Sequence, residues 1–164
     1  MNPFTNVLLD LPELGRIADV AVRLAAAAVL GGALGAEREL VGKAAGLRTH
    51  MLVALGAAMF VVIPSETGVT SADISRVIQG VATGIGFIGA GTILKLRDRE
   101  EIIGLTTAAN LWLTAAIGVG VGMGHLWLPL IGVVIAWVVL VLLTRVEKRI
   151  QAKRRADDMA DESR

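Results

Sequence analysis

The chain has 164 residues, of which 54% are hydrophobic and only 19% are charged, and its formal net charge is +1 at pH 7. Average soluble domains carry about 25% charged residues, and the apolar residues here form long uncharged runs, which excludes a disordered chain and argues against an ordinary soluble domain. Cysteine is absent, so disulfides, thiolate metal sites and cysteine nucleophiles are excluded.

Five runs are candidates for membrane-spanning helices, because a span requires about 20 mostly apolar residues. In chain order they are 17–36, 51–64, 77–94, 102–124 and 126–143. The second run is short, and runs of about 10–14 residues are often re-entrant instead. We nevertheless expect an all-α integral membrane protein in which residues 17–143 form a bundle of five transmembrane helices.

The placement of Lys and Arg predicts the orientation. With five spans, thirteen of the sixteen basic residues share one side, in the segments 38–48, 95–99 and 145–164. Because cytoplasmic loops carry the Lys and Arg excess, we expect a cytoplasmic C-terminus and an external N-terminus. Residues 1–16 then form an external segment without the features of a cleavable signal peptide, and residues 144–164 form a charged cytoplasmic tail.

The glycines recur at helical spacing. Small residues let helix backbones approach closely, which favours helix association in lipid. The segment 84–91 also matches GxGxxG, but that fingerprint requires a preceding strand, so helix packing is the favoured interpretation. The glycines expected at helix contacts are Gly31, Gly35, Gly80, Gly84, Gly86, Gly89 and Gly91. Because these faces exceed what one five-helix bundle requires, we expect a homodimer.

Ionisable residues inside spans are costly and are candidate functional positions. Asp19 and Arg23 lie four residues apart on one helix face, so they can form an ion pair. A structural pair is favoured over an ion or proton pathway, because no second carboxylate within a span lies beside it in sequence.

A charged cluster follows the first span and comprises Glu37, Arg38, Glu39, Lys43, Arg48 and His50. Such a cluster is usually a solvated loop, although this loop is short enough to fold back tightly. Glu37 and Glu39 could supply two of the oxygen ligands that Mg²⁺ prefers. His50 could titrate near neutral pH, but an interfacial anchor is the favoured interpretation.

The fourth span carries a polar stripe at spacings of three and four residues, formed by Thr106, Thr107, Asn110 and Thr114. Threonine can bond to its own backbone, but Asn110 requires a partner on another helix. Structural hydrogen bonding is favoured slightly over a ligand contact.

No hydrolase, metalloprotease or nucleotide-binding motif is present. We therefore expect no enzyme activity, no catalytic residues, no metal site and no cofactor. The basic tail favours anionic lipid headgroups of the bilayer over nucleic acid.

Three segments together resemble the MgtC/SapB family of bacterial inner-membrane proteins. They are GAERE at 35–39 with KAAGLRTH at 43–50, GIGFIGAG at 84–91, and GLTTAANLW at 104–112. The resemblance implies about five spans in the bacterial inner (plasma) membrane. It also implies a link to growth at low magnesium, acid tolerance and virulence, with action on the proton-driven ATP synthase rather than magnesium transport.

By motif match, the resemblance marks Glu37, Arg38, Lys43, Arg48, Thr106 and Thr107 as functional candidates, with Asn110 at a position where the family usually has small residues. Many members carry a basic residue where this chain has Ile103, a role that could pass to Arg97 or Arg99. The chain ends about twenty residues after the fifth span, as a short form without the family's soluble C-terminal domain would.

The favoured hypothesis is a multi-pass membrane regulator of ion and proton homeostasis that contacts another membrane protein, such as the ATP synthase. The alternative is a small cation (magnesium) channel or transporter that uses Asp19, Glu37, Glu39 and Asn110. A structural homo-oligomer without a ligand is the third hypothesis.

Overall fold

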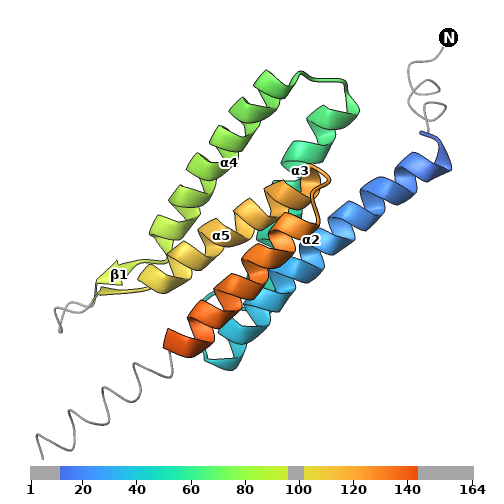
Figure 1. Ribbon diagram of the computed structural model, residues 1–164. Coiled ribbons are helices and arrows are strands. Elements are labelled where there is room, and N and C mark those ends of the chain that lie inside the picture. The colour runs from blue at the N-terminus through green and yellow to red at the C-terminus, as the bar shows by residue number, and fades with distance from the viewer. Residues whose placement is uncertain (1–11, 96–101, 144–164) are drawn as a thin grey trace, which may run out of the picture.

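The computed structural model of the chain describes residues 12–95 and 102–143. These residues form five helices and one pair of short strands (Figure 1). In chain order the elements are α2 (Leu14–Leu40), α3 (Leu47–Glu66), α4 (Ser71–Gly91), β1 (Leu94–Lys95), β2 (Ile102–Ile103), α5 (Leu105–Gly122) and a C-terminal helix (Trp127–Leu143). The predicted helical architecture is confirmed apart from the strands. The predicted tail 144–164 and most of the predicted external segment lie outside the described residues.

Three of these helices, α2, α3 and α5, are long and apolar enough to cross a membrane. The C-terminal helix is apolar but shorter, so the count of five spans stays a prediction, as does the orientation of the termini. Large apolar side chains such as Val29, Phe60 and Phe87 are more than half exposed. An apolar surface of this kind is typical of a membrane or interaction face.

Helix α3 is longer than the apolar run 51–64 predicts. It begins at Leu47, and its 20 residues reach a full span length. The Leu47 amide donates a hydrogen bond of 2.8 Å to Glu39 Oε2, which satisfies one of the unpaired amides at the helix start and places a carboxylate at the positive end of the helix dipole. Arg48 and His50 therefore lie in the first turn of a helix, and the prediction of a loop there was wrong.

The sequence predicts that the fourth apolar run is helical from residue 102, and this prediction was wrong for the start of the run. Ile102 and Ile103 instead form β2, which pairs antiparallel with β1. The next residue, Gly104, has a φ of +95°, a left-handed conformation that glycine adopts readily and that a right-handed helix does not contain. A side chain at Gly104 would also collide with the Thr92 carbonyl oxygen. Helix α5 can therefore begin only at Leu105.

Helices α2 and α3 pack through direct backbone contact. A Cβ added at Gly31 would lie 2.6 Å from the His50 carbonyl oxygen, and one at Gly35 would lie 2.8 Å from the Leu47 Cα. Neither position has room for a side chain. The predicted packing role of Gly31 and Gly35 is therefore confirmed.

Helix α5 contacts α3 through two further glycines. A Cβ added at Gly118 would lie 2.9 Å from the Ala54 Cα, and one at Gly122 would lie 2.8 Å from the Ala58 carbonyl oxygen. Ala54 and Ala58 are fully buried. Helix α3 is thus the central helix, with α2 and α5 both packed closely against it.

Helix α4 runs along the outer side of the bundle (Figure 1). A Cβ at Gly89 would lie 3.5 Å from Ala108 of α5, an ordinary packing contact. The other four glycines of α4 meet no atom within 4 Å in the described part of the chain: Gly80, Gly84, Gly86 and Gly91. The packing predicted for these four is therefore not found among the described residues, because α4 packs on α5 and leaves an open groove beside α3.

Substitution G118A is expected to destabilise the protein by about 1–3 kcal/mol, the usual cost of overpacking, because the Ala54 backbone cannot move away without disturbing α3. The free energy of unfolding, measured by denaturant titration in mixed micelles, checks this. The matched control is G132A in the C-terminal helix, where a Cβ meets nothing within 4 Å. G132A should leave the stability unchanged or raise it by up to about 1 kcal/mol; equal losses in both variants would contradict the packing described.

Candidate functional site

A cluster of buried polar side chains lies where α2, α3 and α5 meet, and we call it the polar cluster. Each member is at most 9% exposed. Polar groups at such depth require hydrogen-bond partners, because an unpaired one costs several kcal/mol in hydrocarbon. The members are Glu37, Arg38, His50, Thr107, Asn110 and Thr114.

His50 and Asn110 join α3 to α5 inside the cluster. Asn110 Nδ2 lies 3.2 Å from His50 Nε2, and His50 Nδ1 lies 2.9 Å from the Gly46 carbonyl oxygen. A carbonyl oxygen only accepts, so Nδ1 carries the proton and Nε2 accepts from the Asn110 amide. The predicted interhelical partner of Asn110 is confirmed. His50 is fully buried, so its assignment as an interfacial anchor was wrong.

Glu37 and Arg38 are consecutive residues near the end of α2, and both are buried. Arg38 Nη1 lies 3.8 Å from Glu37 Oε2. Glu37 Oε2 and Arg38 Nε have no hydrogen-bond partner among the described residues. Buried charges are rarely left unpaired in proteins. This pair is therefore the part of the polar cluster with unused bonding capacity.

Of the six functional candidates that the family resemblance marks, three are exposed on the bundle surface: Lys43, Arg48 and Thr106. Lys43 lies in the tight turn between α2 and α3, where its amide donates 3.0 Å to the Arg38 carbonyl oxygen. Thr106 differs from its neighbour Thr107, which is 4% exposed. The predicted polar stripe of α5 is thus split, with Thr107, Asn110 and Thr114 inside and Thr106 outside. Arg97 and Arg99 lie outside the described residues.

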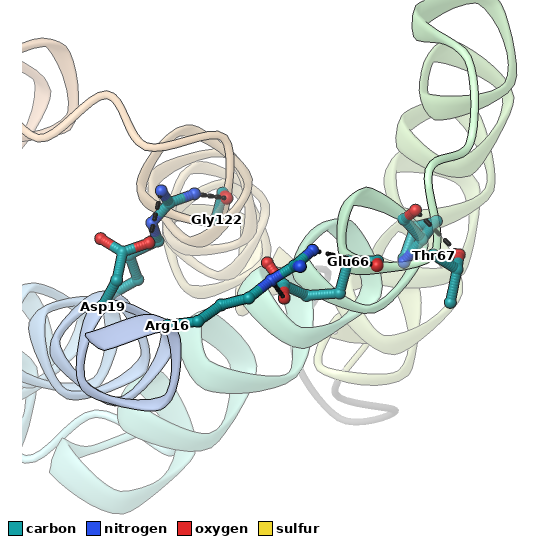
Figure 2. A network of polar contacts seen from close by, with 7 residues as sticks. Arg16, Asp19, Glu66, Thr67 and Gly122 are labelled. Atoms are coloured by element: carbon teal, nitrogen blue, oxygen red, sulfur yellow. Dashed lines mark hydrogen bonds and ion pairs between the residues drawn. The ribbon is translucent and has the colours of Figure 1, made fainter. Parts of the chain in front are cut away.

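The predicted pair of Asp19 and Arg23 is present in α2, with Arg23 Nη2 2.6 Å from Asp19 Oδ2. Arg23 Nη1 also donates to the Gly122 carbonyl oxygen of α5 at 3.4 Å (Figure 2). Asp19 lies 18 residues before Glu37, which is roughly 27 Å along α2. The pair therefore ties two helices together at the end of the bundle remote from the polar cluster.

Sequence reasoning missed a second ion pair at that remote end. Arg16 of α2 pairs with Glu66, the last residue of α3 (Figure 2). The two residues are 50 positions apart, so no local spacing indicated the contact. The available signal was that opposite charges stand at the start of one predicted span and just past the end of the next.

The magnesium site considered for Glu37 and Glu39 is not formed. Glu37 points into the bundle, whereas Glu39 is exposed and bonded to the Leu47 amide. Residues two apart on a helix face opposite sides. Within the described residues no group of three or more His, Asp and Glu side chains could hold a metal ion.

The contact between His50 and Asn110 should be measurable as a coupling energy. In a double-mutant cycle with H50A and N110A, we expect a coupling of about 0.6–2 kcal/mol in the free energy of unfolding, the range for hydrogen bonds between membrane helices. Thr106, exposed on the same helix, provides the control: H50A combined with T106A should be additive. If the effects of H50A and N110A are also additive, the hydrogen bond between His50 and Asn110 is contradicted.

Comparisons with known proteins place the polar cluster inside a shared region. The family model described as MgtC family matches residues 24–149. YhiD of Escherichia coli K12, whose name marks it as a proposed magnesium transporter, is 42% identical over 144 residues, covering 83% of this chain and 66% of YhiD. SrpB of Synechococcus elongatus is 42% identical over 138 residues, covering 77% of this chain and 75% of SrpB.

MgtC of Brucella abortus is 47% identical over 108 residues, covering 66% of this chain and 44% of that protein. The chain thus spans about two thirds of YhiD and less than half of Brucella MgtC. No solved structure matches it. The match over 24–149, together with three helices long and apolar enough to cross a bilayer, shows that the chain belongs to the MgtC family and is a multi-pass protein of the bacterial inner membrane.

Proposed function

We propose that this protein is a non-enzymatic membrane regulator of ion and proton homeostasis, linked to adaptation to low magnesium and acid stress, that acts by contacting another membrane protein. The family and the names of its relatives support a magnesium-related membrane function. The membrane sector of the ATP synthase is the partner that the family resemblance suggests.

The exposure of Lys43 and Thr106 is the observation that carries this proposal. Both lie in segments that resemble family motifs, yet both are exposed and have no ion pair or side-chain hydrogen bond with the described residues. They lie at one end of the bundle, since the starts of α3 and α5 are joined there by His50 and Asn110. Motif residues that do not serve the fold are available for a contact with a partner.

The charge balance of the polar cluster favours regulation over the alternative of a cation channel. Glu37 is the one buried carboxylate among the described residues, and the guanidinium of Arg38 lies beside it. A nearby positive charge offsets the attraction of the carboxylate for a divalent cation. Mg²⁺ also requires near-octahedral oxygen ligation with several retained waters, which a single compensated carboxylate does not provide.

The contact can be tested by site-specific photocrosslinking in intact cells. A photoreactive side chain at position 43 or 106 should crosslink to another membrane protein, identified by mass spectrometry, with a membrane subunit of the ATP synthase as the expected product. The control position is Val69, which is exposed at the opposite end of the bundle. Crosslinks only to a second copy of the chain, or equal yields from position 69, would contradict the proposal.

The alternative function predicts a measurable flux. We expect purified protein in liposomes to give no Mg²⁺ influx above that of protein-free liposomes, measured with an entrapped magnesium-sensitive dye. A flux that is lost in E37Q but kept in E13Q, an exposed carboxylate outside the cluster, would overturn the regulator proposal and establish transport.

A further inference from the structure

A long groove lies between α3 and α4 on the outside of the bundle. Its volume is about 800 Å³, and the side of α5 closes its floor at Ala115. One wall is α3, and the other is the open glycine face of α4, where Gly80 and Gly84 have no neighbour within 4 Å. Apart from one arginine and one threonine at one end, the lining is apolar or glycine.

The groove has the length and lining of a site for hydrocarbon chains. It extends along α3 from Arg48 to Phe60, which is roughly 18 Å. Helices α3 and α4 are joined by a short connection after Glu66, which limits how far they can separate at the Phe60 end. The glycines and aliphatic side chains of the lining offer no polar group along most of this length, so an apolar chain suits that part of the groove.

One end of the groove is suited to an anionic headgroup. Arg48, in the first turn of α3, is the one charged residue of the lining, and Thr49 adjoins it. The Arg48 side chain is exposed and has no ion pair or hydrogen bond with the described residues. Glu39, the carboxylate at the same helix start, is bonded to the Leu47 amide. Basic pockets between membrane helices bind anionic lipid headgroups, and the guanidinium matches a phosphate group in geometry.

We propose that the groove is a binding site for one anionic phospholipid. Its acyl chains lie along the glycine face of α4, against Gly80 and Gly84, and its phosphate pairs with Arg48 at the start of α3. This site explains two of the four unpacked glycines of α4, namely the two that line the groove. A side chain at either position would fill the space that the acyl chains occupy.

Native mass spectrometry of the full chain in a non-ionic detergent tests the site. With phosphatidylglycerol and phosphatidylcholine of identical acyl chains, we expect about fivefold preferential retention of phosphatidylglycerol, the factor that one basic residue near an anionic headgroup supplies. R48Q should lower the preference to about one while a lipid is still retained. G84L should abolish retention of both lipids, because its side chain enters the groove.

Matched controls separate a groove from general adhesion of lipid. K43Q removes an exposed charge outside the lining, and G86L adds the same side chain to α4 at a glycine outside the lining. Both variants should retain the two lipids in the same ratio as the unmodified chain. The site would be refuted by equal retention of the two lipids, by an unchanged preference in R48Q, or by equal losses in G84L and G86L. A dimer that G84L abolishes and that phospholipid does not displace would also refute it, in favour of a second copy.

Discussion

Direct backbone contact on both sides of α3 is the constraint on which the rest of the described structure depends. Lipid chains are as apolar as leucine, so burial does not hold membrane helices together and close packing must do so. Gly31 and Gly35 provide that approach on one side of α3, and Gly118 and Gly122 provide it on the other. With the helix axes fixed this closely, the polar side chains between them have few positions to adopt.

The polar cluster follows from that spacing. His50 and Asn110 come from different helices and reach hydrogen-bond distance only because α3 and α5 approach so closely. In a medium of low polarity, each such bond counts for more and each missing bond costs more. The cluster therefore contains one part in which both ring nitrogens of His50 are bonded, and one part with unpartnered buried atoms, at Glu37 and Arg38. The second part is where a change of bonding would have the largest effect on the helices around it.

Local features of this fold were readable from the sequence, and contacts between distant residues were not. The pair of Asp19 and Arg23 is an i, i+4 contact, so helical periodicity alone predicted it. The need of Asn110 for a partner followed from its depth, but the identity of that partner depended on how far α3 extends. That extent depends on Glu39, which bonds to the Leu47 amide eight residues later.

The spacing of the glycines also did not reveal which glycine-bearing helix face packs against another helix. The GxxxG pairs of α2 and α4 look alike in sequence, yet only Gly31 and Gly35 meet another helix in the described chain. The covered face depends on the tertiary position of the helix, which periodicity does not encode. For the same reason, the exposure of Thr106 beside the buried Thr107 could not be derived from their shared stripe.

The central position of α3 has a consequence for biosynthesis. Its contact with α2 involves segments that follow one another directly, whereas its contact with α5 must wait until some fifty further residues have left the ribosome. The first two helices can therefore enter the bilayer as a preassembled hairpin, with the face of α3 that later meets Gly118 and Gly122 temporarily open to lipid. Arrival of α5 then covers that face, so insertion order, rather than equilibrium packing alone, sets when this side of α3 is first sealed from lipid.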